Sequence, residues 1–138
     1  MKRVLIVSIA SKYSKYPLPK IWVAYLNAEE LAQLLNCEVV DYRCGHGDPS
    51  AYWDEIIQMI IDLQIDTIIV PNLASIAIHI ADGAELLPKL KALGVELYCD
   101  ELGCENLFAT KNFDKKILSL IHCAETSAAK GDEEAGNK

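Results

Sequence analysis

Apolar runs and helically spaced apolar positions alternate along this chain, and together they predict an α/β fold. Short apolar runs rich in β-branched residues predict strands at residues 4–9, 38–42, 67–70 and 95–99. Apolar positions three and four residues apart predict helices over residues 18–35, 52–63, 82–93 and 117–124. Strands that alternate with helices imply right-handed crossovers and a parallel sheet. We therefore expect a three-layer α/β fold, with a parallel sheet of about four to five strands flanked by helices.

Capping residues suggest where two of these helices begin. Asp48 or Ser50 is expected to cap the second helix, because short polar side chains accept bonds from free helical N–H groups. Asp82 and Glu85, three residues apart, have the spacing of a capping box for the third helix. Residues 73–80 are apolar on most sides and are compatible with either a helix or a packed loop.

The length of 138 residues, with 51% hydrophobic and 24% charged residues, predicts one globular domain and excludes collagen, coiled coil and wholesale disorder. We expect the domain to cover residues 1–129 and an acidic, flexible tail to cover residues 130–138. No apolar run approaches the roughly 20 residues that a membrane span needs, and the start is no convincing signal peptide. We therefore expect a cytoplasmic protein without a membrane partner.

Charge is distributed unevenly along the chain. The net charge of −7 argues against a general nucleic-acid binder, which needs a basic face to neutralise phosphates. Residues 1–28 nevertheless contain five basic residues and no acid, whereas residues 29–138 contain 8 basic and 20 acidic residues. Any anion site is therefore expected near the N-terminus.

Two stretches carry a more specific pattern. Residues 66–73 read Asp-Thr-Ile-Ile-Val-Pro-Asn-Leu, and after a variable stretch and a helix, residues 94–97 read Gly-Val-Glu-Leu. At the start of the chain, residues 3–11 read Arg-Val-Leu-Ile-Val-Ser-Ile-Ala-Ser. This order resembles the catalytic domain of the serine recombinases, the resolvases and invertases, over about residues 1–125. The resemblance implies a strand order of 2-1-3-4, a nucleophile at Ser11 and dimerisation through the last helix.

The chain departs from this family at the positions of its catalytic arginines. The resemblance places those arginines where this sequence has other residues, namely Ile9, the pair Ala74-Ser75, and Ile78 or His79. The whole chain contains only Arg3 and Arg43. Cleavage of a phosphodiester through a serine needs several cations or donors around the developing oxyanion, and the planar arginine fork suits that role better than lysine. Ser11 is therefore expected to be vestigial.

The loop after the first strand is the strongest candidate for a binding site. Lys12, Ser14, Lys15 and Lys20 surround Ser11, and the following helix offers free N–H groups at its positive end. Such a loop could hold a phosphate or carboxylate. The alternative is a lysine-rich loop that is simply solvated.

The cysteines invite a metal hypothesis that we set aside. The odd set without a CxxC pair indicates reduced thiols, at Cys37, Cys44, Cys99, Cys104 and Cys123. Cys44-x-His46 and Cys99-x4-Cys104 contain zinc-ligand residue types. In the strand order that the resemblance implies, however, the second and fourth strands lie roughly 14 Å apart. We expect neither a metal nor a cofactor.

The remaining candidates have structural alternatives. Ser75 and His79 would share a helical face if their segment is a helix, but no acid at fixed spacing completes a triad. The aromatic residues most simply belong to the core or to a subunit interface, and they are Trp22, Tyr25, Tyr52 and Trp53.

These observations favour a resolvase-like protein that has lost the recombinase reaction. The leading hypothesis is a scaffold or regulator that acts by homo-oligomerisation, as a homodimer or larger assembly, or by binding a protein partner. One alternative is a small-anion-, nucleotide- or flavin-binding enzyme or sensor that uses residues 11–20. Another is a DNA-binding accessory protein that uses the basic N-terminal segment. Enzymatic activity is left open, with the missing arginines counting against it.

Overall fold

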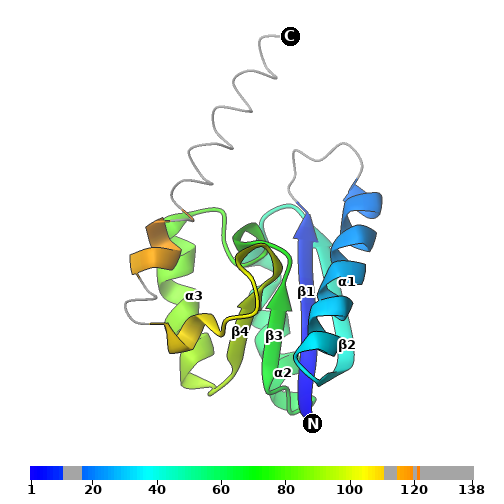
Figure 1. Ribbon diagram of the computed structural model, residues 1–138. Coiled ribbons are helices and arrows are strands. Elements are labelled where there is room, and N and C mark those ends of the chain that lie inside the picture. The colour runs from blue at the N-terminus through cyan, green and yellow to red at the C-terminus, as the bar shows by residue number, and fades with distance from the viewer. Residues whose placement is uncertain (11–16, 111–114, 120, 122–138) are drawn as a thin grey trace.

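The structure, a computed structural model, describes residues 1–10, 17–110, 115–119 and 121, with residues 17–21 described by their backbone alone (Figure 1). Parallel strands form one sheet in the order β2-β1-β3-β4. Their bounds are β1 Lys2–Ala10, β2 Cys37–His46, β3 Thr67–Val70 and β4 Glu96–Cys99. The predicted α/β class and the predicted strand order are both confirmed.

Helices cover both faces of this sheet. Their bounds are α1 Pro17–Leu34, α2 Trp53–Asp62 and α3 Ile80–Ala92, and residues 115–119 are also helical. Short 3-10 turns occur at η1 Pro49–Ala51, η2 Leu73–Ser75, η3 Asp100–Leu102 and η4 Leu107–Ala109. Figure 1 shows α1 against the sheet and the helical turn of residues 115–119 beside α3. Among the described helices, none has the length and apolar character needed to cross a bilayer.

The central strand β1 contributes to two apolar cores, because successive side chains of a strand point to opposite faces. Leu5, Val7 and Ile9 join the core beneath α2 and α3. Val4 and Ile6 join the core beneath α1. Both faces of β1 are therefore buried, which explains the continuous apolar run in its sequence.

Strand β2 continues four residues beyond its predicted end at position 42. The added residues pair with the second half of β1, where Ser8 lies opposite Cys44 and Ala10 opposite His46. Just beyond these paired residues, the Gly47 N–H donates a hydrogen bond of 2.8 Å to the Ala10 carbonyl. The prediction ended this strand too early because residues 43–46 do not continue its apolar pattern. They still pair, since the neighbouring strand β1 is long enough to provide partners.

The predicted helix starts are partly wrong. The Asp48 side chain accepts a bond of 3.0 Å from the Ser50 N–H, but it caps the turn η1, and α2 begins later at Trp53. Helix α3 begins at Ile80, so Asp82 lies inside its first turn and does not cap it. The capping box was wrong because the chain enters the helix directly after the extended residue His79.

The end of β2 packs closely against an aromatic ring. A Cβ atom added to Gly45 would lie 2.7 Å from the Tyr52 ring. The Tyr52 hydroxyl donates to the His46 carbonyl at 2.9 Å and accepts from the His46 N–H at 3.2 Å, so the ring is held in place. Position 45 therefore requires glycine for close approach.

We predict that Gly45→Ala lowers the free energy of unfolding by about 1–3 kcal/mol, since overpacking forces the ring or strand to move. Urea denaturation measures this change. In a Tyr52→Leu background the same substitution is expected to cost clearly less, and a double-mutant cycle reports the difference. An equal cost in both backgrounds would show that contact with the ring is not the cause.

Candidate functional site

A surface hollow lies at the carboxyl ends of β3 and β4, where open parallel sheets bind their ligands. Its volume is about 370 Å³. Its wall comes from α1 and from the loops after the two strands, and it comprises Val23, Ala24, Asn27, Pro71, Asn72, Asp100 and Glu101. A bond of 3.2 Å from the Glu101 N–H to the Pro71 carbonyl joins the two loops. We call this the strand-end hollow.

The strand-end hollow is rich in hydrogen-bond acceptors. Asp100 and Glu101 border it, and its lining among the described residues contains no lysine or arginine. The Oδ1 atom of Asn72 is buried, and no hydrogen-bond partner for it lies in the described part of the chain. An acidic rim repels phosphate and attracts cationic donors. The described lining therefore suits a lysine or arginine side chain better than a nucleic-acid backbone.

The predicted anion-binding residues are not tested by this geometry. Ser11, Lys12, Ser14 and Lys15 lie outside the described residues. Lys20 belongs to α1, but its side chain is also outside the description. The hypothesis of an anion site in this loop therefore remains a prediction.

Both arginines of the chain lie away from the strand-end hollow. Arg3 lies at the amino end of β1, where its Nε and Nη2 atoms donate to the Leu63 carbonyl at 3.2 and 3.0 Å. Arg43 lies on β2, where its Nη2 is 2.8 Å from Glu55 and its Nη1 is 2.7 Å from the Cys44 carbonyl. Its guanidinium lies 5.2 Å from the centre of the Tyr52 ring. Both guanidinium groups therefore hold secondary-structure elements together.

Ser75 has a structural role at the position where the resemblance implies a catalytic arginine. Its side chain is fully buried, and its Oγ accepts a bond of 3.1 Å from the Ile9 N–H. Its carbonyl accepts a bond of 3.0 Å from the Trp53 indole. Ile9 lies beyond the part of β1 that pairs with β3, so the hydroxyl replaces a missing strand partner. Ser75 thus connects β1, the turn η2 and the helix α2.

The proposed pair of Ser75 and His79 does not lie on one helix. Ser75 ends the turn η2, whereas His79 is the extended residue before α3. The buried hydroxyl already accepts a backbone bond, so this segment gives no support to a nucleophilic pair.

The cysteines that the structure describes differ in burial, and Cys123 lies outside the described residues. The free cysteines among the described residues are Cys37, Cys44, Cys99 and Cys104. In that part of the chain, no group of three or more metal-ligating side chains converges on one point. Burial raises the pKa of the Cys99 thiol to about 11. The exposed Cys104 lies in the loop that follows β4.

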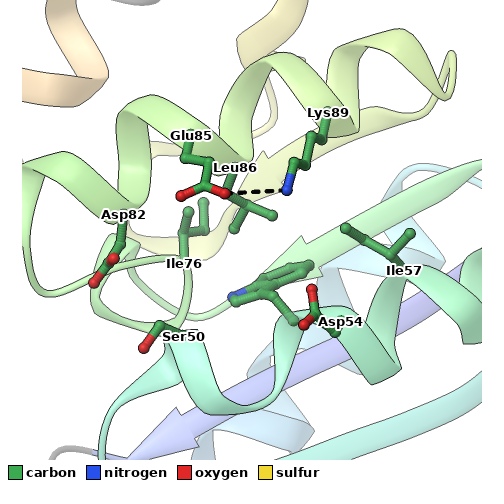
Figure 2. Close-up of a pocket in the computed structure, with 9 residues that line it drawn as sticks. Ser50, Asp54, Ile57, Ile76, Asp82, Glu85, Leu86 and Lys89 are labelled. Carbon is green, nitrogen blue, oxygen red and sulfur yellow. Dashed lines mark hydrogen bonds and ion pairs between the residues drawn. The ribbon is translucent and has the colours of Figure 1, made fainter.

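A second hollow of about 170 Å³ lies between α2 and α3 (Figure 2). Ile57, Ile76 and Leu86 line it, and the carboxylates of Asp54 and Asp82 are among its polar groups. A bond of 3.3 Å joins the Lys89 ammonium to the Glu85 carboxylate. The sequence did not predict this hollow. Its one signal was an acidic residue near the start of each of two helices, Asp54 and Asp82. Its small size makes it the weaker candidate.

Solved structures share the fold of this chain. A resolvase-family site-specific recombinase from Streptococcus pneumoniae aligns with a TM-score of 0.66 and 16% identity, covering 99% of this chain and 95% of that chain. The N-terminal catalytic domain of TP901-1 integrase aligns with a TM-score of 0.61 and 11% identity, covering 98% of both chains. No protein-family model and no curated protein matches the sequence. The protein therefore has a resolvase-like catalytic-domain fold.

We predict that Ser75→Ala lowers the free energy of unfolding by about 1–3 kcal/mol, because the buried Ile9 N–H loses its acceptor. Urea denaturation measures the loss. The matched control is Ser50→Ala, since Ser50 is exposed. Equal stability of the two variants would contradict the structural role of Ser75.

We also predict that iodoacetamide modifies Cys104 in the folded protein at pH 7.5 and leaves Cys99 unmodified. The thiolate is the reactive form of cysteine. The Cys99 thiol is buried and its pKa is raised, so little thiolate forms there. Peptide mass spectrometry measures the modification of each residue. In urea both should react. Rapid labelling of native Cys99 would show that the end of β4 opens readily.

Proposed function

We propose that this chain is a catalytically degenerate resolvase-fold protein that acts by association, as a scaffold or regulator, and does not cut DNA. The observation that carries this proposal is the placement of Arg3 and Arg43. Each guanidinium is engaged in holding the fold together, away from the strand-end hollow. No other arginine exists in the chain to serve a phosphodiester.

The chemistry of strand cleavage supports the same proposal. When a serine attacks a phosphodiester, negative charge develops on oxygens that must be stabilised by fixed donors or cations. The strand-end hollow instead presents Asp100 and Glu101. Ser75 is buried and bonded to the backbone of Ile9. These features favour loss of the reaction with retention of the fold.

Exposed apolar side chains support association. On α1, the exposed fractions of Trp22, Val23 and Leu34 are 62%, 55% and 76%. Large aromatic and aliphatic side chains that are exposed together are typical of protein-binding surfaces. The partner in this proposal is another protein, or a second copy of the chain that forms a homodimer or larger assembly.

We predict that the protein forms no covalent adduct with a mixed-sequence DNA duplex, and that wild type and Ser11→Ala behave alike. Denaturing electrophoresis measures the adduct, and an active serine recombinase on its own site is the positive control. We also expect no duplex binding by fluorescence anisotropy at low or physiological salt. An adduct lost in Ser11→Ala would overturn the proposal. Binding that weakens steeply with salt would overturn it in favour of a DNA-binding accessory role.

A further inference from the structure

The strand-end hollow continues along α1 as a longer groove. A neighbouring hollow of about 350 Å³ shares Asn27 and Asp100 with it. The other residues that line this neighbour are Glu30, Leu31, Leu34, Gly103 and Cys104. Together the two hollows form what we call the α1 groove. One wall is the helix, and the opposite wall is formed by the loops after β3 and β4.

Apolar side chains of α1 run along the helical wall of the α1 groove. Val23 and Leu34 are exposed at its two ends, and the more buried Leu31 lies between them. Trp22 flanks the first end, and its ring is stacked on Tyr25 with 5.8 Å between ring centroids. From the sequence, Trp22 was expected either in the core or at a subunit interface. Its side chain is 62% exposed, which excludes the core. A partly fixed, exposed tryptophan is a typical binding anchor.

The dimensions of the groove fit a helix. Val23 and Leu34 are separated by about 17 Å along the axis of α1, the length of three helical turns. Grooves of this kind bind the apolar face of an amphipathic helix, whose anchors recur every three to four residues.

The charge of the groove selects among such helices. Glu30, Asp100 and Glu101 border it, and its described lining contains no lysine or arginine. A helix with lysine or arginine beside its apolar face would complement these acceptors. A symmetric contact between two copies through this groove would instead place acids against acids.

We propose that the α1 groove binds a basic amphipathic helix of a partner protein. Leu and other apolar side chains of that helix would contact Val23, Leu31 and Leu34. Its flanking cations would face Glu30, Asp100 and Glu101. This inference rests on the proposed function, since it names the class of partner for a protein that acts by association.

The test uses two fluorescent synthetic peptides of about 16 residues, the length of a four-turn helix. Both carry the same leucines at helical spacing, and their polar faces carry lysine and arginine in one and glutamate in the other. Fluorescence anisotropy with the full chain at physiological salt measures binding. We expect the basic peptide to bind at least tenfold more tightly than the acidic one. Equal affinities, or no binding of either peptide, would overturn the inference.

Paired variants locate the binding surface. Val23→Gln with Leu34→Gln is expected to weaken binding of the basic peptide about tenfold. Its control is Ile61→Gln, because Ile61 on α2 is 53% exposed and lies outside the groove. Unchanged binding in the double variant, with a native circular dichroism spectrum, would overturn the inference.

Charge reversal tests the acidic rim separately. Asp100→Lys with Glu101→Lys should abolish the preference for the basic peptide. Asp54→Lys with Asp62→Lys on α2 changes the net charge equally and should preserve that preference. An equal loss in both variants would show that only net charge matters and would overturn the inference.

Light scattering on the same samples identifies the competing occupant. If the wild type is an oligomer that Val23→Gln with Leu34→Gln dissociates, the groove binds a second copy and the inference fails. The proposed function would survive that result, because a homo-oligomeric scaffold is part of it. A Ser11-dependent DNA adduct would remove the proposed function whatever the peptides do, so the two failures are distinguishable.

Discussion

The structure depends on β1, a strand buried on both faces that pairs with β2 and β3 at once. Because its side chains on both faces are apolar, burial alone does not fix its position along the sheet. Polar contacts at its two ends do so. The Arg3 guanidinium binds the Leu63 carbonyl at the amino end, and the Ser75 hydroxyl accepts the Ile9 N–H near the carboxyl end.

These same contacts determine where Arg3 and Ser75 lie. Arg3 is one of only two arginines, and its role at the amino end of β1 keeps it away from the strand-end hollow. Ser75 stands where the resemblance implies an arginine, and burial of its hydroxyl extends the core to the end of β1. Arg3 and Ser75 are therefore both engaged in stabilising the central strand.

The sequence was sufficient to predict an element where burial alone determines its structure. Strand β3 was predicted at its observed bounds, because all four of its residues are buried and Pro71 cannot continue the ladder. The end of β2 was missed, since His46 pairs only because β1 reaches Ala10. The α1 groove was also missed, because it joins α1 to loops some 50 to 80 residues away in sequence. No local sequence pattern indicates that segments so far apart in the chain will lie side by side.

A shared fold does not by itself determine the chemistry of a site. A parallel sheet fixes where a ligand can approach, since its carboxyl ends open toward the loops, but the side chains there decide the charge of that ligand. Phosphate requires cations at this edge, and the described lining supplies Asp100 and Glu101 instead. Because the adjoining helix adds exposed Val23 and Leu34, the edge combines acidic and apolar groups. That combination of acidic and apolar groups is the basis for proposing a lysine- or arginine-bearing amphipathic helix as the partner.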